Sequence, residues 1–145
     1  MKEQLDVLII KPYQRPIRAT IDHDLEAMQQ IVGGTIEAVY PFQDKACIVV
    51  DDEGKLKGYT ENRVLRDRHG EPYDILVGNF FVVGLDNDDF CSLTPQQMDY
   101  YEKMYFQPEM FGHIGNSVYV YPLADSQIAK EDSNMLLQEE TDLEL

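Results

Sequence analysis

Residues 75–83 read Ile-Leu-Val-Gly-Asn-Phe-Phe-Val-Val, an almost continuous apolar run in a chain of 145 residues. A strand with one face in water alternates apolar and polar residues, whereas this run predicts a central strand that is covered on both faces. Gly78-Asn79 divides the run and indicates a bulge, a turn or a close approach of another backbone segment. The run therefore predicts a sheet with a buried middle strand.

Two pairs of strands are predicted upstream of this run. Residues 5–10 form a short apolar segment, and residues 17–21 alternate apolar and polar side chains, which together predict a β-hairpin. Residues 36–40 and 46–50 predict a second pair. A polar, glycine-containing turn at residues 51–55 follows them.

Three further segments have weaker patterns. Residues 55–59 are expected to form a strand or a loop, and residues 117–121 predict a last edge strand. Residues 61–67 are interpreted as a helical turn in which Val64 and Leu65 point inward and the arginines face solvent.

A first helix is predicted over residues 23–32. Asp22 is expected to cap its N-terminus, and Gly33 supplies the left-handed residue that commonly ends a helix. Gly33-Gly34 therefore indicates a helix end and a tight reversal. Glycine loops that bind phosphate precede a helix instead of following one, which makes the phosphate-binding alternative the weaker reading.

A second helix is predicted over residues 95–106, with the clearest start signal in the chain. Thr94 stands at the cap position, Pro95 at the first helical position, and Gln97 three residues after the cap. Its apolar and tyrosine positions recur at helical spacing and indicate a face that packs against the core.

These elements predict an α+β fold in a single domain over residues 1–123. A mostly antiparallel sheet of about five or six strands is expected to pack with the two main helices. Residues 124–145 hold seven acidic residues and one lysine, and they predict an acidic, flexible C-terminal tail.

Charge restricts the possible partners. The chain has 12 basic and 27 acidic side chains and a net charge of −15, so most of its surface is expected to repel phosphate backbones. Direct nucleic-acid binding is therefore not expected. A small anionic ligand at a locally basic spot and a basic host protein on the acidic surface both remain possible partners.

Cysteine usage and hydropathy predict a cytoplasmic protein that does not enter a membrane. Cys47 and Cys91 are far apart and lack the paired spacing of a zinc site, which favours reduced thiols. The N-terminal residues do not match a signal peptide, and no run approaches the roughly 18 apolar residues of a membrane-spanning helix. No metal, cofactor or catalytic motif is predicted, and an enzyme is the less favoured class.

A basic cluster within residues 55–68 is the candidate ligand site. Five basic and two acidic side chains give this window a net charge of +3 in an acidic chain. Lysine and arginine can bind an anion, and asparagine beside them can donate and accept hydrogen bonds. The predicted ligand-binding residues are Lys55, Lys57, Asn62, Arg63 and Arg66. A solvated loop that pairs with the acidic turn before it is the alternative.

An enzymatic alternative starts from the acidic residues that follow the apolar strand at 46–50. Asp51 and Glu53, with Glu37 delivered from an earlier strand, could bind magnesium and orient a water molecule. This pattern would make the protein a metal-dependent hydrolase or a nuclease-like enzyme.

Several segments in the same order resemble a family of small proteins of unknown function. Phages, plasmids and conjugative elements of Gram-positive bacteria encode this family. The matching segments are residues 31–39, 53–58 with Asn62 and Arg63, 74–84, 89–90 and 92–93.

The resemblance implies a mobile-element setting and an accessory or counter-defence role, and it transfers no catalytic residues. Together with the charge pattern, it predicts a non-enzymatic binding protein. Such a protein would capture a small anionic, nucleotide-like ligand or block a host protein.

Overall fold

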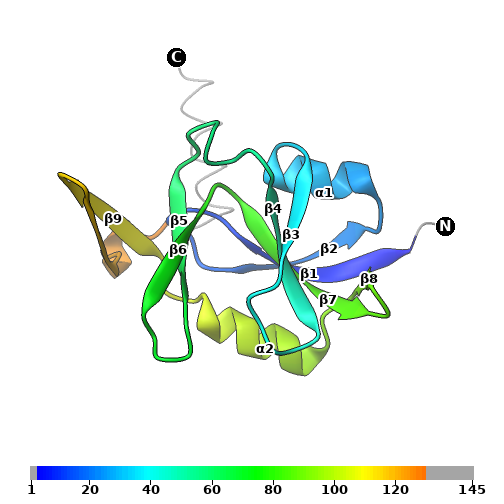
Figure 1. Ribbon diagram of the computed structural model, residues 1–145. Helices are drawn as coiled ribbons and strands as arrows, with labels where there is room; N and C mark the ends of the chain where they lie inside the picture. The colour runs from blue at the N-terminus through cyan, green and yellow to red at the C-terminus, as the bar shows by residue number, and fades with distance from the viewer. Residues whose placement is uncertain (1–2, 130–145) are drawn as a thin grey trace, which may run out of the picture.

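The computed structural model describes residues 3–129, which form an α+β domain of ten strands and two α-helices (Figure 1). The strands are β1 (Gln4–Ile10), β2 (Ile17–Asp22), β3 (Ile36–Val39), β4 (Ala46–Asp51), β5 (Glu61–Arg66), β6 (Pro72–Val77), β7 (Phe80–Asp86), β8 (Asp89–Cys91), β9 (Glu109–Ile114) and β10 (Ser117–Pro122). The helices are α1 (Leu25–Val32) and α2 (Pro95–Met104), with a short 3-10 helix, η1 (Asp125–Gln127).

The main sheet has six strands in the order β2-β1-β7-β4-β3, with β8 paired to β7, and every pair in it is antiparallel. The predicted fold class is thus confirmed, as are the two predicted strand pairs. Central strand β7 is buried from Phe80 to Gly84. Of the alternatives predicted for Gly78-Asn79, the structure has the turn: Gly78 has φ of 70°, and residues 75–77 lie in β6 of a separate hairpin and not in the central strand.

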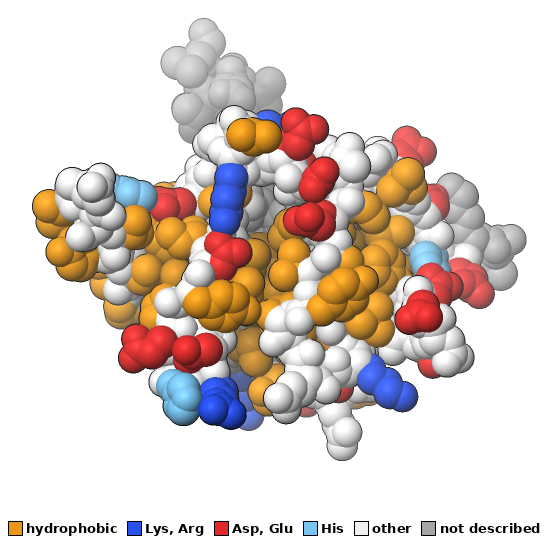
Figure 2. Space-filling model, viewed as in Figure 1, with side chains coloured by type: hydrophobic (Ala, Val, Ile, Leu, Met, Phe, Trp, Pro, Cys, Tyr) orange, Lys and Arg blue, Asp and Glu red, His pale blue; other side chains and the backbone are white. Residues whose placement is uncertain are grey.

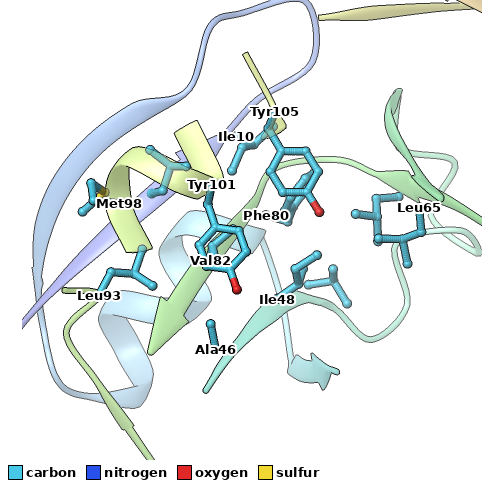
Figure 3. Packing of buried hydrophobic residues seen from close by; sticks show 13 residues of the cluster. Ile10, Ala46, Ile48, Leu65, Phe80, Val82, Leu93, Met98, Tyr101 and Tyr105 are labelled. Atoms are coloured by element: carbon cyan, nitrogen blue, oxygen red, sulfur yellow. The ribbon is translucent and has the colours of Figure 1, made fainter. Parts of the chain in front are cut away.

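The sheet has a core on each face, because successive side chains of a strand point to opposite sides. Helix α1 covers one face, where Met28 and Val32 pack with Val49 and Phe81. Helix α2 and the β5–β6 hairpin cover the other, and Figure 3 shows Tyr101 close to the strand residues there. The second core includes Leu8, Ile48, Leu65, Leu76, Phe80, Val82, Met98, Tyr101 and Tyr105.

Local capping determines where both helices begin. Thr94 and Gln97 form the predicted capping box, in which the Gln97 amide donates to the Thr94 hydroxyl at 3.1 Å. The predicted cap of α1 was wrong by two residues: Asp24 accepts from the Ala27 amide at 2.8 Å, whereas Asp22 is still paired in β2. Gly33, at φ of 94°, ends α1 as predicted.

The predicted helical turn at residues 61–67 is wrong, because β5 occupies this segment and pairs with β6. The predicted outward arginines are also wrong at Arg63, which is 2% exposed. Two register irregularities, between Glu61 and Arg63 and between Leu65 and Arg66, break the alternation that would have marked a strand in the sequence.

Strands β9 and β10 form a two-stranded hairpin, defined here as the arm, which projects from the domain (Figure 1). The strand predicted at 117–121 is therefore present, in a sheet of its own. After the arm, the chain returns along the domain, where the Ala129 amide donates to the Tyr13 carbonyl at 3.0 Å. The rest of the predicted tail, residues 130–145, lies outside the described residues. Within residues 3–129, no helix has the length and apolarity needed to cross a bilayer.

Candidate ligand-binding groove

Two of the five predicted ligand residues, Asn62 and Arg63, are buried. Asn62 is 0% exposed, and its side-chain amide donates to the carbonyls of Ile10 at 3.0 Å and Gly78 at 2.7 Å. These carbonyls belong to the end of β1 and to the turn between β6 and β7. Asn62 therefore joins the β5–β6 hairpin to the main sheet.

Arg63 makes the largest set of buried polar contacts in the described part of the chain. Its guanidinium donates to the Tyr105 carbonyl at 2.9 and 3.2 Å, to the Gln14 carbonyl at 2.7 Å and to Asn62 Oδ1 at 2.9 Å. Tyr105 is the C-cap of α2, where helix carbonyls carry partial negative charge. Burial lowers the pKa of Arg63 to about 10. The guanidinium stays charged at neutral pH, carbonyl dipoles stabilise the charge, and the side chain joins three segments of the fold.

The two predicted lysines are paired elsewhere. Lys55 Nζ lies 2.6 Å from Asp74 Oδ1, and Lys57 Nζ lies 2.7 Å from Asp51 Oδ2. Tyr59 also donates to Asp51 Oδ2, at 2.8 Å. The structure therefore does not bring Lys55 and Lys57 together with Arg63.

The contacts of Asp51 favour a glycine at position 34, directly after the C-cap of α1. A Cβ on Gly34 would lie 2.5 Å from Lys57 Nζ and 2.7 Å from Asp51 Oδ2, so a larger residue would separate this ion pair from the helix end. Burial by itself would raise the pKa of Asp51, but hydrogen bonds from Lys57, the Glu53 amide and Tyr59 outweigh it and lower the pKa. The Asp51 carboxylate is therefore bound by Lys57, Tyr59 and the Glu53 amide of its own fold.

The carboxylates of the enzymatic alternative are not gathered. Glu37 pairs with Val50 and Ile36 pairs with Asp51, so Glu37 and Asp51 project from opposite faces of the sheet. Within residues 3–129, no group of three or more His, Cys, Asp or Glu side chains could hold a metal ion. The magnesium site thus lacks the geometry that it requires.

A groove of about 1140 Å³ lies between the β5–β6 hairpin, α2, the loop after β3 and strand β10. Figure 2 shows apolar side chains, in orange, across the middle of the face formed by the hairpin and the sheet. Phe42 and Tyr101 form part of the floor, with ring centroids 4.5 Å apart. The aromatic lining is Phe42, Tyr73, Tyr100, Tyr101, Tyr105 and Tyr121.

Two tyrosines on the groove rim are more than half exposed to solvent. Tyr73, on β6, is 58% exposed and Tyr100, on α2, is 59% exposed. Tyr101 follows Tyr100 directly, and because neighbours on a helix point in different directions, it is buried where Tyr100 is not. The sequence predicted the buried face of α2 correctly, and the Tyr-Tyr pair was the available signal that an aromatic ring would remain outside.

Two arginines from the end of β5 and the following turn line the same groove. Arg66 Nη2 lies 2.9 Å from Glu109 Oε2, and the side chain of Arg66 remains 46% exposed. Arg68 donates to the His69 ring at 3.3 Å and forms no ion pair with a carboxylate of another residue in the 3–129 range. Of the five predicted ligand residues, Arg66 is thus the one with an accessible charge in the groove, and Arg68 adds a second.

Asp44 supplies a fixed acceptor in the groove. Its Oδ2 accepts from the Tyr101 hydroxyl at 2.9 Å and from the Gln97 side chain at 3.1 Å. Burial raises the pKa of Tyr101, and the bond to Asp44 raises it further. The groove therefore combines a neutral aromatic surface, the three carboxylates of Asp44, Asp67 and Glu109, and two accessible guanidinium groups, of which Arg66 is paired with Glu109.

Comparison with protein-family models matches residues 1–106 to DUF3846, a domain of unknown function. The matched range ends after α2, so the arm lies beyond it. No curated protein and no solved structure matches this chain.

Proposed function

We propose, from the geometry of the groove, that this chain, which belongs to the DUF3846 family of unknown function, is a non-enzymatic binding protein. Its ligand would be a small anion with a planar ring, of the nucleotide class. The observation that carries this proposal is the placement of exposed Tyr73 and Tyr100 in one groove with Arg66 and Arg68.

Each part of such a ligand has a counterpart in the groove. Tyrosine rings present flat apolar surfaces on which a base can stack, and stacking contributes about 1–3 kcal/mol per base. The guanidinium groups of Arg66 and Arg68 can bind phosphate oxygens through paired hydrogen bonds. The groove volume of about 1140 Å³ leaves room for a ligand longer than a single nucleotide.

This proposal changes the set of ligand residues predicted from sequence. Arg66 keeps its predicted role, and Arg68 replaces the lysines as the second anion contact. Arg63 borders the groove, but its guanidinium donates its hydrogen bonds to the protein's own carbonyls. We assign it the role of holding the groove wall.

The sequence resemblance motivates the setting that we propose for this binding activity. We place the protein in the cytoplasm of a cell that carries a phage, plasmid or conjugative element, with capture of the ligand acting against a host defence. Blocking of a basic host protein by the acidic surface is the competing form of this role.

Isothermal titration with ATP, ADP and adenosine tests the groove. Micromolar binding of at least one phosphorylated probe is expected, with adenosine at least tenfold weaker because it lacks the phosphate. Tyr100→Ala and Arg68→Ala should each lower the affinity about tenfold, a loss of roughly 1.4 kcal/mol. The control is Tyr40→Ala, which removes a tyrosine that is 66% exposed and does not line the groove.

Native mass spectrometry of the purified protein extends the test to ligands other than these probes. A retained mass that disappears on denaturation, and is lost from Arg68→Ala, would identify the natural ligand. The proposal fails if no phosphorylated probe binds and no mass is retained, or if both groove variants bind as well as the wild type.

A further inference from the structure

The arm exposes apolar side chains on both of its strands, and one edge of β10 is unpaired. Ile114 is 70% exposed, Val118 43%, Tyr119 52% and Tyr121 46%. Strand β10 pairs with β9 on one side, and no other strand in the described range pairs with its second side. Its backbone donors and acceptors on that side are thus available to another strand.

The arm lacks the usual protection of an exposed edge. Natural edge strands carry lysines, inward charges or bulges that prevent pairing with another chain. Residues 114–122 hold no Asp, Glu, Lys or Arg, in a chain with 12 basic and 27 acidic side chains. The six pairs between β9 and β10 run without a register shift, and Pro122 stands at the last position of β10.

We propose that β10 pairs antiparallel with β10 of a second copy of this chain, across a two-fold axis. The strand reads Ser-Val-Tyr-Val-Tyr-Pro. If the axis passes beside Tyr119, Val118 of each copy lies opposite Val120 of the other, and the two Tyr119 residues face each other. Cross-strand pairs of β-branched and aromatic residues are among the most favourable in antiparallel sheets.

Charge favours a second copy as the occupant of this edge. A basic partner would gain nothing from an edge without carboxylates, whereas two copies that each carry a net charge of −15 can associate only where their charges do not oppose each other. Antiparallel pairing also places the two domains at opposite ends of the joined strands. Pro122, at the base of each strand, would lie six residues along the ladder from Pro122 of the other copy, about 20 Å at roughly 3.4 Å per residue and beyond the screening length of about 8 Å.

The size of the contact sets its strength. The five facing residues of each strand, 117–121, fall short of the roughly 800 Å² per partner of a standard stable interface. The dimer is therefore weak and depends on concentration. Pairing of the arms uses the second edge of β10, whose Val120 and Tyr121 also line the groove, so the measurements are made without added ligand.

Sedimentation equilibrium from about 5 μM to about 500 μM tests the dimer, since weak interfaces dissociate in this range. The mass should rise from that of the 16.7 kDa monomer toward twice that value. Val118→Lys should remain monomeric throughout, because it places a charge opposite the apolar Val120 of the other copy. Leu56→Lys adds the same charge at a side chain that is 87% exposed on the 51–60 turn, and it should dimerise as the wild type does.

Hydrogen exchange of the wild-type protein provides a second measurement that does not depend on a variant folding. The β10 amides should exchange more slowly at high concentration than at low concentration. A constant monomer mass overturns the proposal, as does a dimer that Val118→Lys leaves intact. Protection of β10 that is independent of concentration also overturns it, because the chain's own residues would then cover the edge.

Discussion

Replacement of Arg63 by methionine is expected to destabilise the protein strongly without emptying the site of side-chain volume. The change removes the donors for two buried acceptors, the Tyr105 carbonyl and the side-chain oxygen of Asn62, and for the part-buried Gln14 carbonyl. Each buried acceptor without a partner costs about 1–3 kcal/mol. Since methionine regains part of this by burying apolar surface, we expect a net loss of about 3–5 kcal/mol.

Urea denaturation measures this loss directly. The chain has no tryptophan, so far-UV circular dichroism or tyrosine fluorescence follows unfolding. With a urea dependence of about 2 kcal/mol per molar, the midpoint should fall by about 1.5–2.5 M. Arg63→Lys keeps the charge but offers a single donor group, and it should lie between the wild type and Arg63→Met.

Arg68→Met is the matched control, because it makes the same substitution at an exposed arginine of the following turn. Its midpoint should move by less than about 0.3 M, since exposed substitutions stay within about 0.5 kcal/mol. If Arg63→Met unfolds at the wild-type urea concentration, or if both variants shift equally, the guanidinium does not hold these segments together.

Two further substitutions test close packing and charge. In urea denaturation, Gly78→Ala should lower the free energy of unfolding by at least about 1–2 kcal/mol more than Gly58→Ala does. The two glycines have similar φ angles, 70° and 72°, but only a Cβ on Gly78 would meet the Tyr59 ring, at 2.5 Å. Equal losses would disprove the packing role of Gly78. The hydrogen-bonded Asp51 carboxylate has a pKa below its ordinary value of 3.8, so its contribution is present above that pH and is lost as the pH falls through and below it. Asp51→Asn should therefore lower stability at pH 7 and flatten the acid dependence, whereas Asp52→Asn, at an exposed neighbour, should leave the acid profile unchanged.

Local chemistry accounts for what the sequence predicted well. The Thr94 capping box and Gly33 act within one helical turn. The alternation of apolar and polar residues at 17–21 is enough to predict that this segment forms a strand of the first hairpin. Such signals need no knowledge of the rest of the chain. The capping error at α1 has the same origin, because Asp22 and Asp24 both suit a cap and only the pairing of β2 decides between them.

Long-range contacts account for what the sequence missed. Asn62 and Arg63 look like solvated residues because their acceptors lie on Ile10, Gln14 and Tyr105, far away in the chain. No local pattern encodes those carbonyls. The groove was missed for a related reason: its walls come from separate segments, and the basic cluster in the sequence is divided between different faces of the fold.

The position of the arm places one wall of the groove outside the two cores that stabilise the fold. One wall of the groove, with Val120 and Tyr121, follows the range matched to the family, and Glu109 attaches that wall to β5 through the Val64 amide and Arg66. Changes in the length or sequence of the arm can reshape this wall while the two cores and the Arg63 contacts stay intact. For the proposed ligand-binding role, specificity could thus change through the arm with little penalty to the stability of the fold.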